Sequence, residues 1–257
     1  MLEYLQSALL GLIQGVTEFL PVSSSGHLLI FHKLFGDTQN TLVLDAILHL
    51  ATGLALLIYF RKDWYSLLTQ WRTSLLKLVI AGSIPAVVVG ILFEKEIENY
   101  LRSPWVVVVM LIGVGLLMWI VDRNNENGIK KLTELSLGTA LFIGAMQAVA
   151  LVPGTSRAGI TLIAGLMVGL SRREALRFTF LLGMPITLGT GLMKIPDLTN
   201  SNYELMPVVL AFSVAMVTGL IAIRWLLSFV SNHSLVSFVI YRWILAGVLV
   251  VYLLHSY

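Results

Sequence analysis

The chain of 257 residues contains no cysteine and few charged side chains. Without cysteine it cannot form disulfides, thiolate metal sites or a thiol nucleophile. Charged residues make up 12% of the sequence, against about 25% in a typical soluble domain, and hydrophobic residues make up 57%. The mean hydropathy of +0.87 agrees with this balance. Such a composition predicts a protein of the lipid bilayer.

The basic residues form no patch of the kind that binds nucleic acid. The formal net charge is only +3, and the lysines and arginines are scattered at the ends of apolar segments. The N-terminus lacks the basic start and the cleavage site of a secretory signal. Because no polar stretch is long enough to fold alone, we predict a single integral membrane domain over residues 1–257.

Six apolar segments are long enough to span a bilayer, which takes about 17–25 helical residues. They are Thr41–Phe60, Ser74–Phe93, Pro104–Val121, Ala175–Ile195, Met206–Phe229 and Leu235–Leu254. Two further apolar regions, Leu2–Phe35 and Leu135–Leu170, are interrupted by proline, serine and glycine. Each is typical of a re-entrant helix–break–helix, tolerated at membrane depth only where protein encloses it. The predicted fold class is an all-α polytopic membrane protein with about six transmembrane helices and two re-entrant regions.

The distribution of lysine and arginine indicates an orientation, because cytoplasmic loops are enriched in both. Of the seventeen basic residues, twelve lie on one proposed inner side, Arg224 and Arg242 among them. Four lie on the opposite side, and Arg157 at a break completes the count. This bias places both termini outside and lets the two breaks enter from opposite faces, so that they meet.

The two interrupted regions also resemble each other. In both, a Gly-x-x-Gln pair precedes the break, and a glycine follows the glutamine by twelve residues; these are Gly11, Gln14 and Gly26, then Gly144, Gln147 and Gly159. A second similarity links residues 82–85 (Gly-Ser-Ile-Pro) with residues 183–185 (Gly-Met-Pro). The pattern predicts an inverted repeat, with halves of roughly 1–121 and 122–257 and a shared central site. A chance match of small residues is the alternative.

Polar side chains gather at the first break, at a density that usually marks function in a membrane. Gln14 and Glu18 are four residues apart, so they share one helical face that points at the break. A run of small and polar residues follows: Ser23, Ser24, Ser25, Gly26 and His27. One serine is enough to cap the next helix, which leaves two hydroxyls for another role.

The second break opens its helix with Gly154, Thr155 and Ser156 and adds Arg157. Free N–H groups at a half-helix N-terminus bind anions, and a guanidinium fork suits phosphate oxygens. The simpler alternative is an Arg157–Glu18 ion pair that joins the breaks. Phosphoryl transfer to water needs an anion-binding site, a guanidinium, a nucleophile, a group that donates and accepts protons, and a carboxylate that binds a cation. The two breaks together contain all of these groups.

The histidines have a plainer interpretation. An isolated membrane histidine is more often a hydrogen-bonded link between helices than a catalyst, so His27 gains weight only beside the carboxylate, hydroxyls and arginine. Asp45 and His49, four residues apart in the first span, could face the site, although core packing near the outer interface is the preferred interpretation.

Two long motifs carry a resemblance to a known family. They are Gln14-x-x-x-Glu18 with Pro21-x-Ser23-Ser24-Ser25-Gly26-His27, and, in the second interrupted region, Pro153-Gly154-Thr155-Ser156-Arg157-Ala158-Gly159. With these motifs, essentially the whole chain resembles the bacterial undecaprenyl-diphosphatase (bacitracin-resistance) family. The resemblance implies a multi-pass enzyme of the bacterial inner membrane. It would remove one phosphate from the C55 isoprenoid diphosphate at the outer face and recycle the lipid carrier of peptidoglycan synthesis.

The resemblance also implies roles for single residues. Glu18 and Gln14 would hold a divalent cation, Mg²⁺ or Ca²⁺, and Arg157 would bind phosphate. Ser24 matches a proposed nucleophile or phosphate ligand, and His27 matches the rival nucleophile or proton donor. The predicted substrate-binding residues are Ser23, Ser25, Gly26, Gly154, Thr155 and Ser156. The chain departs from the common pattern at Gln14, where many members have glutamate, and at Ala158, where serine is frequent.

Other functions compete with hydrolysis. Paired broken helices are also transporter architecture, so a polyprenyl-phosphate transporter or flippase is the main alternative and a non-catalytic membrane scaffold a third. Glu18, His27 and Arg157 together favour hydrolysis. The sequence does not distinguish a covalent intermediate from direct attack by water, and it leaves open whether the chain forms a homo-oligomer.

Overall fold

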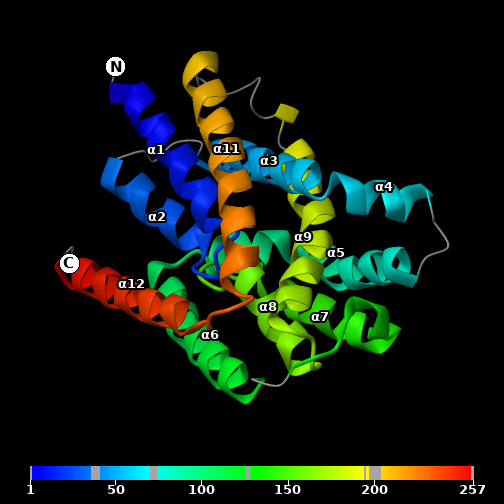
Figure 1. Cartoon of the computed structure of the whole chain (residues 1–257). Coiled ribbons are helices and arrows are strands. Elements are labelled where there is room, and N and C mark those ends of the chain that lie inside the picture. The colour runs from blue at the N-terminus through cyan, green and yellow to red at the C-terminus, as the bar shows by residue number, and fades with distance from the viewer. Residues whose placement is uncertain are drawn as a thin grey trace.

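The computed structural model describes residues 2–35, 41–69, 74–125, 128–193, 195–196 and 204–255. Within these ranges the chain is helical, without a β-strand (Figure 1). The elements are α1 (Leu2–Thr17), α2 (Ser24–Phe35), α3 (Thr41–Tyr59), α4 (Arg61–Thr69), α5 (Ser74–Tyr100), α6 (Pro104–Asn124), η1 (Leu132–Glu134), α7 (Leu137–Val149), α8 (Arg157–Met167), α9 (Arg172–Met193), α11 (Leu205–Phe229) and α12 (Val236–His255).

Five of the described helices are long and apolar enough to cross a membrane: α5 over Ser74–Phe93, α6, α9, α11 and α12. A sixth candidate span comprises α3 and α4, which are bent by 72° where they join. The predicted all-α polytopic fold with about six spans is therefore confirmed. Helix α4 was not predicted, because Arg61, Lys62 and Asp63 at its start are typical of a loop.

Both interrupted regions are pairs of short helices. The first break runs from Glu18 to Ser23, between α1 and α2, and the second spans residues 150–156, between α7 and α8. The second helices begin at Ser24 and at Arg157, so both of these side chains lie in first helical turns. With 12 and 11 residues, these helices are about 16–18 Å long, too short to cross a hydrocarbon core of about 30 Å.

The helices of the first half recur in the second half with the same packing. α1 packs along α11 as α7 packs along α5, while α3 lies against α9 and α6 against α12 (Figure 1). Glycines allow the backbones to approach: a Cβ on Gly11 would lie 2.3 Å from the Ala211 carbonyl oxygen, and one on Gly144 would lie 2.1 Å from that of Gly82.

The two breaks repeat each other in backbone conformation. Ser23 and Ser156 each directly precede a half-helix, with φ angles of 73° and 71°. They are the non-glycine residues of the described chain with positive φ, a strained conformation that functional sites often retain. The hydroxyls accept hydrogen bonds from the Gly26 and Gly159 N–H groups at 3.4 and 3.1 Å. These two serines therefore define which residues of the two halves are equivalent.

The sequence similarity between residues 82–85 and 183–185 does not belong to this structural repeat. The first segment lies in α5 and the second in α9. α9 packs against α3, whereas α5 corresponds in its packing to α11. The two similar sequence segments therefore lie in helices that are not equivalent in the repeat. This part of the repeat prediction is wrong.

The core lies around α8, whose residues from Ala158 to Leu166 are all buried. Phe19 of the first break packs edge-on against Phe180 of α9, with ring centroids 5.6 Å apart. Many large apolar side chains on the surrounding spans are exposed, as expected for helices that face lipid. Protein thus encloses both breaks, the condition under which non-helical backbone is stable at membrane depth.

Candidate active site

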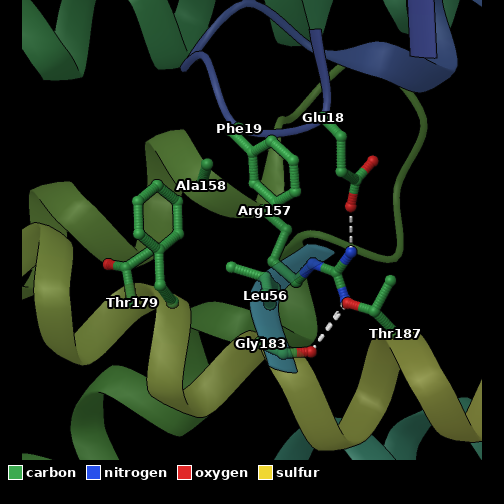
Figure 2. A pocket seen from close by; sticks show the side chains of 9 residues that line it. Glu18, Phe19, Leu56, Arg157, Ala158, Thr179, Gly183 and Thr187 are labelled. Atoms are coloured by element: carbon green, nitrogen blue, oxygen red, sulfur yellow. Dashed lines mark hydrogen bonds and ion pairs between the residues drawn. The ribbon is translucent and has the colours of Figure 1, made fainter. Parts of the chain in front are cut away.

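Glu18 directly follows α1 and is 8% exposed, and its contacts define the site. Its N–H donates to the Gln14 carbonyl at 2.9 Å, so the two side chains share a face as predicted. The Gln14 amide and the Ser24 hydroxyl donate to its Oε2 atom at 3.0 and 2.7 Å. The Arg157 guanidinium forms an ion pair with Oε1 (Figure 2).

The Glu18–Arg157 pair joins the first break to the second, so the ion pair proposed as the simpler alternative is present in this structure. Arg157 also donates to the Gly183 carbonyl on α9 at 3.4 Å, and Figure 2 shows it between these two acceptors. The Gly154 N–H donates to the Ser25 hydroxyl at 3.3 Å, which adds a second link between the breaks.

The three consecutive serines have three different partners. Ser23 caps α2, Ser24 donates to Glu18, and Ser25 accepts from the second break. This division agrees with the expectation that one serine caps and two hydroxyls remain. Thr155, predicted to bind substrate, is fully buried, and its hydroxyl donates to the carbonyl of Val152 at 2.7 Å. Its side chain stabilises the break rather than lining an open site.

His27 is directed away from Glu18 and Arg157. Its Nδ1 atom lies 2.7 Å from the Ser23 carbonyl oxygen and its Nε2 atom 2.7 Å from the Tyr241 hydroxyl. Because a carbonyl oxygen can only accept a hydrogen bond, Nδ1 carries the hydrogen. Nε2 of the neutral ring then accepts a hydrogen bond from the Tyr241 hydroxyl. The rings are stacked, with centroids 5.6 Å apart. The described contacts of His27 thus lead to α12.

His49 belongs to the Glu18 cluster. Its Nδ1 atom lies 3.0 Å from the Gln14 amide nitrogen and 3.2 Å from the Glu18 carboxylate. The core-packing interpretation is therefore wrong for His49. Asp45 points elsewhere and pairs with His32 at 2.8 Å. The four-residue spacing of Asp45 and His49 was the only sequence signal for this contact.

Arg242 was assigned to the inner side because it lies near the end of a span, and that assignment is wrong. Its side chain is completely buried and contacts the backbone of both breaks. Neither Arg242 nor its neighbour Tyr241 belongs to a motif, and their contacts lie far away in sequence. No local sequence pattern indicates that either residue contacts the breaks.

Comparison with known proteins agrees with the resemblance of the motifs. Residues 7–248 match the family described as bacitracin resistance protein BacA. The chain belongs to this family. It is similar to an undecaprenyl-diphosphatase of Trichlorobacter lovleyi (41% identity, covering 98% of both chains) and to one of Thermodesulfovibrio yellowstonii (41%, covering 99% of this chain and 98% of the other). An undecaprenyl-diphosphatase 1 of Pseudoalteromonas translucida is 38% identical over 98% of this chain and 99% of its own.

A narrow pocket lies beside the ion pair of this BacA-family chain (Figure 2). Glu18 and Arg157 form its charged end, and aromatic and aliphatic side chains form its walls. The lining residues are Glu18, Phe19, Leu56, Arg157, Ala158, Thr179, Phe180, Gly183 and Thr187.

The metal prediction concerns Glu18 and Gln14. Gln14 is completely buried, and its Oε1 atom has no hydrogen-bond partner in the described part of the chain, so it remains a free acceptor. No group of three His, Asp or Glu side chains suited to a metal occurs among the described residues. Carboxylate and amide oxygens are ligand types that Mg²⁺ and Ca²⁺ bind, but in this structure the Gln14 amide turns its nitrogen toward Glu18, so a shared cation requires the amide to rotate. The cation stays a prediction.

Proposed function

We propose that this protein is a membrane phosphatase that hydrolyses undecaprenyl diphosphate to undecaprenyl phosphate and inorganic phosphate. The reaction would recycle the lipid carrier of cell-wall synthesis. The single observation that carries the proposal is the hydrogen bond of 2.7 Å from Ser24 to Glu18, beside the Arg157 guanidinium. A hydroxyl nucleophile, a carboxylate base and a phosphate-binding cation then share one enclosed site. The names of the relatives support the same substrate.

Arg157 and the N-terminus of α8 bind the diphosphate. The phosphate oxygens replace Glu18 as the partners of the Arg157 guanidinium. The Glu18 carboxylate is then free to act as a base. The helix N-terminus adds its N–H groups and the positive end of its dipole. A divalent cation at Glu18 and Gln14 would supply further neutralisation of the diphosphate charge.

Ser24 attacks the terminal phosphorus, and its proton passes to Glu18 Oε2. The bond between that phosphorus and the bridging oxygen breaks, so that undecaprenyl phosphate leaves. Glu18 releases this proton to solvent, and the restored carboxylate then takes a proton from water, which attacks the phosphoserine. The bond between phosphorus and the Ser24 oxygen breaks, Glu18 returns the proton to that oxygen, and inorganic phosphate is released. Ser24 is favoured over His27 as nucleophile because it alone contacts the carboxylate, whereas both ring nitrogens of His27 are engaged elsewhere.

His27 is the proton donor of this scheme. It lies three residues after Ser24 on α2, so the two side chains share a helical face. Rotation of the ring away from Tyr241 would bring Nε2 toward the bridging oxygen. A proton taken up from solvent at Nε2 would then pass to the bridging oxygen and neutralise the leaving phosphate.

We place the site at the outer face of the bacterial inner membrane, as the family resemblance implies, and the bias of the basic residues gives the orientation of the termini. Only the diphosphate head must reach Arg157, because the C55 tail can remain in the bilayer.

The test is phosphate release from undecaprenyl diphosphate by the purified protein in detergent, with and without EDTA. We expect Ser24→Ala to lower kcat at least about 1,000-fold, as removal of a nucleophile does. Ser231→Ala, at an exposed loop serine, serves as the control and should remain active. Full activity of Ser24→Ala would contradict the assignment. Release of no phosphate by the wild type, with movement of lipid between liposome leaflets, would favour the transporter.

A further inference from the structure

The guanidinium of Arg242, on α12, connects both breaks to α6. Its Nη1 atom donates to the carbonyl of Pro21 in the first break at 3.2 Å, and Nη2 donates to that of Gly154 in the second break at 3.0 Å. Nη2 also donates to the Met110 carbonyl at 2.9 Å, and Nε to that of Leu111 at 3.2 Å. Four backbone carbonyls thus converge on one side chain that has no exposed surface.

This environment is unusual for a buried cation, because buried charges are normally paired with an opposite charge. The described hydrogen-bond partners of Arg242 are all neutral carbonyls. A guanidinium offers five donors in a rigid fork, a geometry that no other side chain reproduces. The four hydrogen bonds therefore depend on the planar geometry of the guanidinium.

The two break carbonyls occupy equivalent positions. Pro21 lies two residues before Ser23, and Gly154 lies two residues before Ser156. Glu18 lies three residues before Pro21, and Arg157 lies three residues after Gly154. Arg242 therefore holds each break three residues from one member of the Glu18–Arg157 pair.

The arginine itself is not repeated. When the halves are aligned on Ser23 and Ser156, Arg242 corresponds to Val109 of α6, whose side chain is largely exposed. Glu18 and Arg157 neutralise each other, whereas Arg242 has only backbone carbonyls as hydrogen-bond partners in the described part of the chain.

We propose that Arg242 is a positioning residue, which holds the two breaks at the separation that the Ser24–Glu18–Arg157 site requires. The role rests on the proposed phosphatase function. Small displacements of reacting groups are costly, since about 1 Å of misplacement can lower a rate about 100-fold. Arg242 acts through the backbone and does not contact the substrate.

Kinetics of phosphate release test the role with three variants. Arg242→Gln removes the fork and should lower kcat about 100-fold while KM changes less than about threefold, because Arg157 still binds phosphate. Arg242→Lys keeps the charge without the fork and should recover part of kcat. Trp243→Phe is the matched control, because Trp243 Nε1 donates to the Ile112 carbonyl of α6 and touches neither break; it should retain wild-type kcat. A raised KM with unchanged kcat in Arg242→Gln, or wild-type kcat in Arg242→Lys, would overturn the positioning role.

A distance measurement tests the same role without activity. Since the chain has no cysteine, spin labels can be attached at Leu29→Cys on α2 and Met167→Cys on α8. We expect Arg242→Gln to shift or broaden the distance distribution between the labels and Trp243→Phe to leave it unchanged. An unchanged distribution in Arg242→Gln would overturn the proposal. If the wild type released no phosphate, the proposed function would fail, and the distances would still decide the role of Arg242.

Discussion

The two breaks share a backbone and differ in almost every reactive side chain. Each has a serine with positive φ that caps a half-helix through a glycine N–H group. At positions made equivalent by these serines, the first break has Glu18, Ser24 and His27 where the second has Leu151, Arg157 and Ile160. The repeat supplies the scaffold twice, but carboxylate, hydroxyl and imidazole come from one copy and the guanidinium from the other. Neither break is a complete site.

The glutamines that precede the breaks show the same division. Gln14 donates to Glu18 and lies beside His49. Gln147 is 2% exposed, and neither of its amide atoms has a hydrogen-bond partner in the described part of the chain. The residues equivalent to Glu18 and His49 are Leu151 and Leu182, which cannot form hydrogen bonds through their side chains. The polar network has formed around only one of the two glutamines.

Removal of the carboxylate should have the largest effect. We expect Glu18→Gln to lower kcat at least about 1,000-fold, because the Ser24 hydroxyl loses its proton acceptor and Arg157 its ion pair. The measurement is phosphate release by the purified variant. Leu151→Ala, at the equivalent position of the second break, is the control and should lose less than about threefold. Similar losses in both variants would contradict the division of roles.

A change at Arg157 should have the next largest effect. Arg157→Lys keeps the charge but loses the fork that binds two phosphate oxygens, so kcat/KM should fall about 100-fold. Arg224→Lys, at an exposed position of α11, should retain wild-type kinetics. An Arg157→Lys variant with wild-type kcat/KM would show that any positive charge suffices.

Loss of the Tyr241 hydroxyl should have a smaller effect. Tyr241→Phe keeps the stacked ring and removes the hydrogen bond to His27 Nε2, so we expect kcat to fall by less than about tenfold. Tyr65→Phe, at an exposed tyrosine of α4, is the control. An unchanged kcat in Tyr241→Phe would indicate that His27 acts independently of α12.

The smallest effect on activity is expected at Gln147. Gln147→Leu removes a buried amide without partners, so we expect unchanged kcat and a gain of about 1 kcal/mol in the free energy of unfolding. Thermal unfolding in detergent checks the gain. Gln14→Leu is the comparison and should lose activity, since it removes the donor to Glu18. Loss of stability in Gln147→Leu would indicate a role for the second glutamine.

Much of the fold was predictable from hydropathy, which located the spans near α3, α5, α6, α9, α11 and α12 and the two interruptions. The site motifs were predictable as well, because polar residues in an apolar chain stand out. Arg242 was misplaced, because charge bias cannot distinguish a span end from a cation buried among carbonyls. The contact of Tyr241 with His27 joins residues 214 positions apart, and no local pattern indicates it.

The central claim is that the two breaks meet in one site through Glu18 and Arg157. Thermal unfolding of Glu18→Gln, Arg157→Gln and the double variant tests it most directly. Breaking a buried pair leaves one charge uncompensated, whereas removal of both partners relieves that penalty. We predict that each single variant lowers the unfolding midpoint and that the double variant regains most of the loss. Losses that simply add in the double variant would contradict the claim.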